Sequence, residues 1–187
     1  ALVLASLAWG LPSALADDAG AIKIKRSITV NEVGDAKIRV EVKMTAEGYT
    51  TAKTNNPNTS VLLRRLGAGN HWVKLENVRG QFDDTASAVV IEYNQLSLAR
   101  MIGDDLWEIA LDSDTKHELL GAFDNNGVLT TTTQTDLGSS AVNIRIEVPK
   151  TAKELQLLRN PERLTYRFTP PATQGTKTAG SKCNSMR

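Results

Sequence analysis

The sequence predicts a mainly β fold, α+β at the margin: an antiparallel sheet or sandwich of about eight to ten strands, with one short helix packed on it. Strict alternation of apolar and charged residues over 37–44 is the first observation. The second is a series of strand-like segments separated by turn-forming residues. The third is the lack of a strand-helix-strand rhythm, which argues against a parallel doubly wound sheet.

The first two strand-like segments predict a hairpin. Apolar residues alternate over 22–30 and again over 38–44, and residues 31–35 between them contain Gly34. Alternation of this kind is typical of a strand with one buried face and one solvated face. Lys23, Lys25 and Arg26 form a basic cluster, which we interpret as the solvent face of the first strand.

A short helix is expected over 59–66. Asn58, Thr59 and Ser60 offer capping oxygens, and Gly67 follows the last apolar residue. A turn of helix over 47–53 is a further possibility that the spacing of apolar residues allows.

The remaining strand-like segments continue to the end of the predicted domain. An Asn-Gly pair at 126–127 is the strongest hairpin signal in the chain. The predicted strands cover residues 72–78, 88–93, 106–111, 116–123, 127–135, 143–148, 155–158 and 164–168.

The first residues have the pattern of a secretory signal peptide. An apolar stretch, then Gly10 and Pro12, then Ala14-Leu15-Ala16 before two aspartates, predicts a truncated signal peptide over 1–16. We therefore expect one β-rich domain over 17–169, a flexible Pro/Thr/Gly-rich tail over 170–187, and a secreted, periplasmic or cell-surface location. No segment predicts an integral membrane span.

Composition excludes some classes of function. The apolar fraction is 41%, the charged fraction is 23% and the formal net charge is +1, values that are ordinary for a globular domain. A balance so close to zero argues against binding to nucleic acid. Cys183, the one cysteine, lies in the expected tail and suggests a free thiol or an intermolecular bridge.

No catalytic motif stands out. A Gly-x-Ser-x-Gly elbow is absent from the sequence. His71 and His117 are interpreted as ordinary surface or edge histidines. A hydrolase that uses loop carboxylates is the less favoured hypothesis.

The only candidate metal ligands are loop aspartates. Asp112 and Asp114 could bind calcium, which prefers oxygen ligands from loops. The spacing is not that of an EF-hand, because Phe123 stands where that loop needs a glutamate. The alternative is that aspartate is common in turns because its side chain bonds nearby backbone. No other cofactor is expected.

Two further groups of residues are candidate binding elements. Trp72 and Trp107 lie in strand-like segments, where core packing is the default interpretation and a platform for stacking a sugar is the alternative. Thr130, Thr131, Thr132 and Thr133 put hydroxyl groups on both faces of a strand, which favours a sheet edge available for assembly.

The sequence therefore favours a non-catalytic exported module of the cell envelope or extracellular space. Its expected partner is another protein or a second copy of itself. The alternative hypothesis is a domain that binds a small ligand or a carbohydrate.

Overall fold

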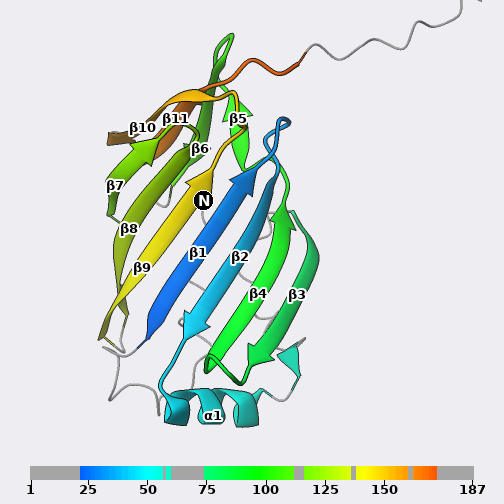
Figure 1. Ribbon diagram of the computed structural model, residues 1–187, viewed down its shortest axis with the longest axis vertical. Coiled ribbons are helices and arrows are strands. Elements are labelled where there is room, and N and C mark those ends of the chain that lie inside the picture. The colour runs from blue at the N-terminus through cyan, green and yellow to red at the C-terminus, as the bar shows by residue number, and fades with distance from the viewer. Residues whose placement is uncertain are drawn as a thin grey trace, which may run out of the picture.

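The structure is a computed structural model that describes residues 22–56, 58–59, 74–111, 116–135, 138–159 and 162–171, without the side chains of 133–135 and 138–140. Within these ranges it contains one helix, α1, and eleven strands in two sheets (Figure 1). The expected signal peptide and nearly all of the expected tail lie outside the described residues. The mainly β fold class with one short helix is confirmed.

The larger sheet has seven strands in the order β3-β4-β2-β1-β9-β8-β7. Its strands are β1 (Lys23–Val30), β2 (Ala36–Lys43), β3 (Leu75–Asp83), β4 (Ala88–Gln95), β7 (His117–Phe123), β8 (Asn126–Thr135) and β9 (Gly138–Glu147). Side chains alternate between the two faces, and in β2 every second residue is buried. The predicted hairpins β1–β2 and β7–β8 are confirmed.

One pair of neighbouring strands in this sheet runs parallel. β1 pairs with β9 from Ile24 opposite Val142 to Thr29 opposite Glu147. All other neighbours in the sheet are antiparallel. The expectation of a purely antiparallel sheet is therefore wrong at this pair. Alternation has period two in both kinds of strand, so it carries no information about direction.

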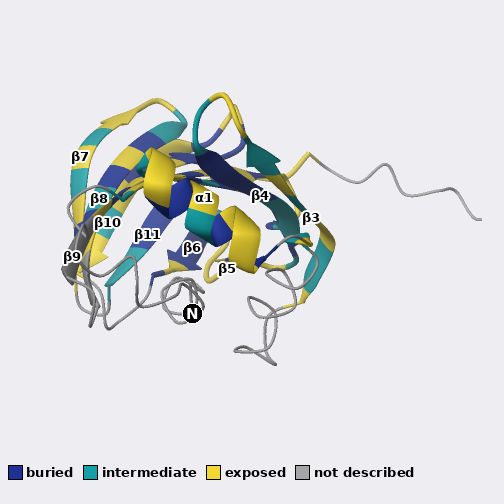
Figure 2. Ribbon diagram, turned by 90° about the horizontal axis from the view of Figure 1, so that it is seen from below, coloured by how far each residue is buried: buried dark blue, intermediate teal, exposed yellow. Residues whose placement is uncertain are grey.

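The smaller sheet is antiparallel and has the order β10-β11-β6-β5. Its strands are β5 (Ala99–Met101), β6 (Leu106–Ala110), β10 (Lys153–Arg159) and β11 (Glu162–Arg167). It lies on the concave side of the larger sheet, at the end opposite α1 (Figures 1 and 2). β5 was not expected, because three residues are too few to show a period.

The inner faces of the two sheets form one apolar core. Ile28, Ile38 and Ile144 of the larger sheet and Ile109 and Leu164 of the smaller one are each at most 1% exposed. Full burial of one such side chain contributes about 1.5–3 kcal/mol. Figure 2 shows the buried faces of β4, β6 and β11 on the inside of this layered arrangement.

The helix occupies a different position from the one favoured by the sequence. α1 spans Ala46–Asn55, and Thr45 is its N-cap: the Thr45 hydroxyl accepts a hydrogen bond from the Gly48 N–H at 3.1 Å. The minor signal over 47–53 is thus the helix that the structure describes. The helix expected over 59–66 lies, apart from Thr59, outside the described residues.

Two polar contacts fix α1 to the end of the larger sheet. The hydroxyl of Tyr49 and the ammonium of Lys53 both donate to Asp84, each at 2.6 Å. These hydrogen bonds, from Lys53 first and Tyr49 second, lower the pKa of Asp84. Burial and then Asp84 raise the pKa of Tyr49 to about 12, so its hydroxyl stays a donor. The Tyr49 ring also packs edge-on against Phe82.

The β1–β2 turn joins the two sheets. Gly34 has a φ of +88°, and its carbonyl accepts a hydrogen bond from the Ala99 N–H at 2.9 Å. A Cβ at this position would lie 2.3 Å from the Ala99 carbonyl oxygen and 3.1 Å from the Trp107 ring. Both the dihedral angle and the close approach of β5 therefore require glycine here.

We expect Gly34→Ala to lower the free energy of unfolding by about 2–4 kcal/mol, because strain and a backbone clash add together. Urea denaturation followed by circular dichroism measures this change. Gly103→Ala is the matched control, since its Cβ would meet Leu106 at an ordinary 3.6 Å. Equal stability of the two variants would show that the turn does not constrain the sheets.

Candidate functional site

Trp107 is a core side chain. It is 7% exposed, stacks on Tyr166 with ring centroids 6.3 Å apart, and packs against Phe168. Its Nε1–H donates to the Phe168 carbonyl at 2.9 Å. The sugar-stacking alternative requires an exposed ring face, which this buried ring does not offer. Trp72 lies outside the described residues, so its role stays a prediction.

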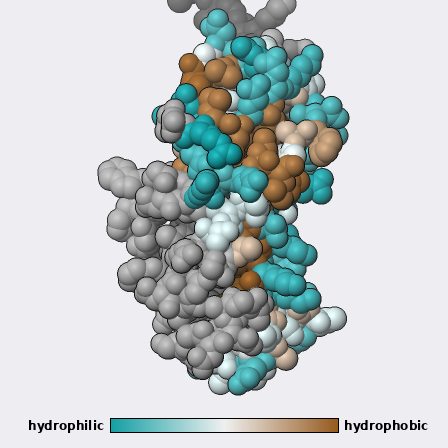
Figure 3. Space-filling model, turned by 90° about the vertical axis from the view of Figure 1, so that its left-hand side faces the viewer, coloured by the Kyte–Doolittle hydropathy of each residue, from teal (hydrophilic) through white to brown (hydrophobic). Residues whose placement is uncertain are grey.

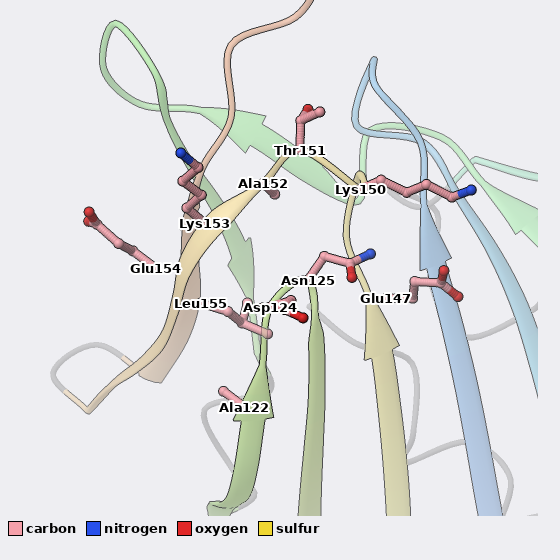
Figure 4. A pocket seen from close by; sticks show the side chains of 10 residues that line it. All are labelled: Ala122, Asp124, Asn125, Glu147, Lys150, Thr151, Ala152, Lys153, Glu154 and Leu155. Atoms are coloured by element: carbon pink, nitrogen blue, oxygen red, sulfur yellow. The ribbon is translucent and has the colours of Figure 1, made fainter.

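An open groove of about 730 Å³ lies between the β7–β8 turn and the β9–β10 connection (Figure 4). Asp124, Glu147, Lys150 and Glu154 line it, but in Figure 4 their charged ends point in different directions. Glu154 also pairs with Arg167 at 3.0 Å. Without convergent charges, the groove has no geometry for acid–base chemistry.

Several of the described aspartates have structural partners. Asp83 accepts hydrogen bonds from the N–H groups of Thr85 and Ala86, both at 3.0 Å. Asp105 pairs with Arg167. Among the described residues, no group of three or more acidic, histidine or cysteine side chains could hold a metal ion. Asp112 and Asp114 fall outside these residues, and calcium there stays a prediction.

The threonine strand is not the edge of the sheet. β8 lies between β9 and β7, so the edge role expected for Thr130–Thr133 is wrong over the part of β8 that pairs with β7. The Thr131 hydroxyl is buried and donates to the Lys116 carbonyl at 2.9 Å, whereas Thr132 is exposed. The side chain of Thr133 lies outside the description. Threonine suits an interior strand equally well, because its branching at Cβ favours any strand.

The edge of the larger sheet on this side is β7. Among the described strands it pairs only with β8, and its pairing is interrupted between Leu119 and Gly121 by a bulge at Leu120. Leu120 is 59% exposed, Phe123 is 76% exposed and the neighbouring Val128 of β8 is 38% exposed. We call these three residues the edge patch. Figure 3 shows apolar side chains gathered in the upper half of this side of the molecule.

The opposite edge, β3, is protected differently. It also carries a bulge, between Glu76 and Arg79, and Asn77 there has a φ of +54°. Charged side chains recur along this strand, and a single large apolar residue, Val78, is exposed on it. Charges and bulges are devices that keep an edge from pairing with another chain. β7 has the bulge, but it has no charged residue from Leu119 to Phe123.

His117 differs from its expected role. It lies on an edge strand, but its side chain is 0% exposed, so the expectation of a surface histidine is wrong. Its Nδ1 lies 2.9 Å from a carboxylate oxygen of Glu162 on β11. The backbone N–H of His117 donates to the same carboxylate. The pair therefore connects the two sheets. Its position in phase with Leu119 was the signal that the side chain points inward.

A second buried acid lies on the smaller sheet. Glu108 of β6 is 2% exposed and pairs with Arg100 of β5 and with Arg163 of β11, the latter at 2.9 Å. Arg100 lies directly opposite Glu108 on β5, and Arg163 lies on β11 two positions from Thr165, which is opposite Glu108, so a cation reaches the acid from each neighbouring strand. This arrangement satisfies the charge and leaves no free acid for chemistry.

Arg26 is the residue that the sequence interpretation misplaced most. It was assigned to the solvent face, but its side chain is buried on the inner face of β1. Lys23 and Lys25 do point outward, and Arg26 is in phase with Ile24 and Ile28. Alternation of side chains along the strand predicts that Arg26 points inward. Its charge favoured the solvent face, and that prediction is wrong.

Comparison of the chain with models of protein families, with curated proteins and with solved structures finds no match. In the part of the chain that the structure describes, no helix is both long and apolar enough to cross a membrane. The candidate site therefore follows from the geometry above: the β7 edge outside, and Arg26 inside.

We expect Glu162→Ala to lower the free energy of unfolding by about 2–4 kcal/mol, because it leaves buried donors of His117 without an acceptor. Thermal or urea denaturation measures this loss. The control is Glu154→Ala, which removes a 60%-exposed partner of Arg167 and should cost less than about 1 kcal/mol. A similar loss in both variants would contradict a structural role for the buried pair.

Proposed function

We propose that this protein is a non-catalytic exported module that acts through protein–protein interaction, with the β7 edge as its docking surface. The observation that carries the proposal is the edge patch. Leu120 and Phe123 expose large apolar side chains on a strand whose outer side has no partner among the described strands. Apolar patches of this kind are typical of interaction sites.

The β7 edge offers two kinds of contact at once. Its outward N–H and carbonyl groups can accept a further strand, and backbone pairing of this kind supplies affinity. The edge patch also exposes apolar area to water. Covering this area with a partner is favourable by about 25 cal/mol per Å². The Phe123 ring lies over Gly121, where a Cβ would be only 3.2 Å from it, so the ring is held close to the strand.

The charges that flank β7 fit a second copy of the same strand. An antiparallel pair centred on Leu120 would put Lys116 opposite Asp124 of the second copy, and Glu118 opposite Ala122. Lys116 and Asp124 are both exposed. Opposite charges facing each other across strands are favourable, and a two-fold arrangement repeats the contact at both ends. The proposed assembly is therefore a dimer that joins the two larger sheets.

We expect the protein to dimerise and the double variant Leu120→Lys/Phe123→Lys to be monomeric, because the two ammonium groups at position 120 would face each other and those at position 123 would lose the apolar contact. Size-exclusion chromatography with light scattering over a concentration series measures the molar mass. The control is Val78→Lys, which adds a charge at an exposed apolar position on the other edge and should leave the dimer intact. A wild-type protein that stays monomeric at the highest concentration would reject self-assembly.

The charged ends of the proposed contact can be tested separately. Lys116→Glu should weaken the dimer about tenfold or less, and Asp124→Asn should weaken it by a smaller factor. Asparagine suits this position because Asp124 has a φ of +48°. If Lys116→Glu and wild type have the same dissociation constant at low salt, the register proposed here is incorrect.

The alternative function is the binding of a small ligand. The specific observation in its favour is the buried guanidinium of Arg26. The hydrolase hypothesis has no comparable support among the described residues, because the acids that line the groove in Figure 4 diverge and Glu108 and Glu162 are paired.

A further inference from the structure

The edge strands of the two sheets lie on the same side of the molecule. β7 is an edge of the larger sheet and β10 is an edge of the smaller one, and the two strands contact each other (Figures 1 and 2). Among the described strands each pairs with a single neighbour, β7 with β8 and β10 with β11. A partner that extends the larger sheet at β7 therefore also meets β10.

The contacts between the two layers show how β10 lies over β7. A Cβ on Gly127, which is opposite Ala122 in the β7–β8 pair, would lie 2.8 Å from the Leu155 side chain. At the other end of β7, Arg159 lines a cleft of about 340 Å³ together with His117. β10 therefore runs antiparallel to β7, with Leu155 near the end of β7 and Arg159 near its start.

The proposed β7 pairing also aligns the two β10 strands of the dimer. A two-fold axis between antiparallel edge strands is perpendicular to the sheet that they join, so the smaller sheets of both copies lie on the same side of it. In the register centred on Leu120, the start of β7 in one copy faces the end of β7 in the second copy. Arg159 of one copy then lies beside the beginning of β10 in the second copy, which contains Glu154 and Leu155.

The charges at these two places are complementary and accessible. Arg159 is exposed, and no ion pair among the described residues uses it. Glu154 is 60% exposed; its Oε2 pairs with Arg167, whereas its Oε1 has no partner among the described residues. In Figure 4 the Glu154 carboxylate points away from β9 and β1, toward the side of the molecule where β7 is the edge. A second copy docked at β7 can therefore reach it.

We propose that Arg159 of one copy binds in the groove of Figure 4 on the second copy, where it pairs with Glu154. This pairing rests on the proposed dimer and adds a second layer to its interface, made by the smaller sheets. The groove has room for a guanidinium, since its volume is about 730 Å³. Acids outnumber cations among the described residues that line the groove, and cations outnumber acids in the cleft that Arg159 lines. Complementary charges of this kind fix the register of an interface.

Charge reversal and rescue test the pairing. We expect Arg159→Glu to weaken the dimer about tenfold, because the contact occurs twice in a symmetric dimer and a repulsion replaces each attraction. Adding Glu154→Lys should return the dissociation constant to within about threefold of wild type, because the pair is then reversed and the net charge is that of wild type. Sedimentation equilibrium at low salt measures the dissociation constants.

Arg79→Glu is the matched control. Arg79 is exposed on β3, at the opposite edge of the larger sheet, and its reversal changes the net charge by the same amount. It should leave the dissociation constant unchanged. An effect as large as that of Arg159→Glu, or a double variant as weak as the single one, would overturn the pairing. A dimer that Arg159→Glu does not weaken would reject this contact but not the β7 dimer, whereas a monomeric wild type would reject both.

Cross-linking locates the contact directly. In the variant Arg159→Lys, a carbodiimide should join the new ammonium group to Glu154 of the second copy through an amide bond. Within one chain these positions are five residues apart on a strand, roughly 16 Å, which is too far for a zero-length link. Mass spectrometry on a mixture of ¹⁴N- and ¹⁵N-labelled chains identifies links between copies. The absence of a mixed-label link to Glu154 in a dimeric sample would contradict the proposed contact.

Discussion

The structure depends on mutual burial of the inner faces of its two sheets. Strands such as β2 and β9 have one apolar side, and their sheet cannot cover that side alone. Ile38 and Ile146 on the larger sheet and Ile109 and Leu164 on the smaller one are each 0% exposed, which is possible only with the layers in contact. Turns and connections, such as the contact of Gly34 with β5, hold the sheets in the alignment that this burial requires.

The polar groups inside this core are treated in three ways. Glu108 is paired on both sides, and His117 has one carboxylate partner that also accepts its backbone N–H. Arg26 has a single neutral acceptor and two unpaired nitrogen atoms. His117 Nε2 and the Nε of Arg163, which pairs with Glu108, are also buried without a hydrogen-bond partner. Among the described residues, Arg26 differs from these two groups in having no carboxylate partner.

The two edges of the larger sheet are also unlike each other. β3 combines a bulge with charges along its length, whereas the bulge of β7 places Leu120 in solvent beside Phe123. Both edge strands thus carry a β-bulge, but the edge of β3 is charged and the edge of β7 is apolar. β7 is an edge strand, whereas β1, which carries Arg26, is the central strand of the seven.

The β class, the β1–β2 and β7–β8 hairpins and the inward face of β2 could be predicted from the sequence, because period-two alternation and turn residues act locally. The sequence also contained the phase that puts Arg26 and His117 inside, although their charge suggested the surface. The parallel β1–β9 pair, the edge position of β7 and the partner of each buried charge could be seen only in the folded chain. These depend on which distant strands meet, and alternation is the same whichever neighbour a strand has.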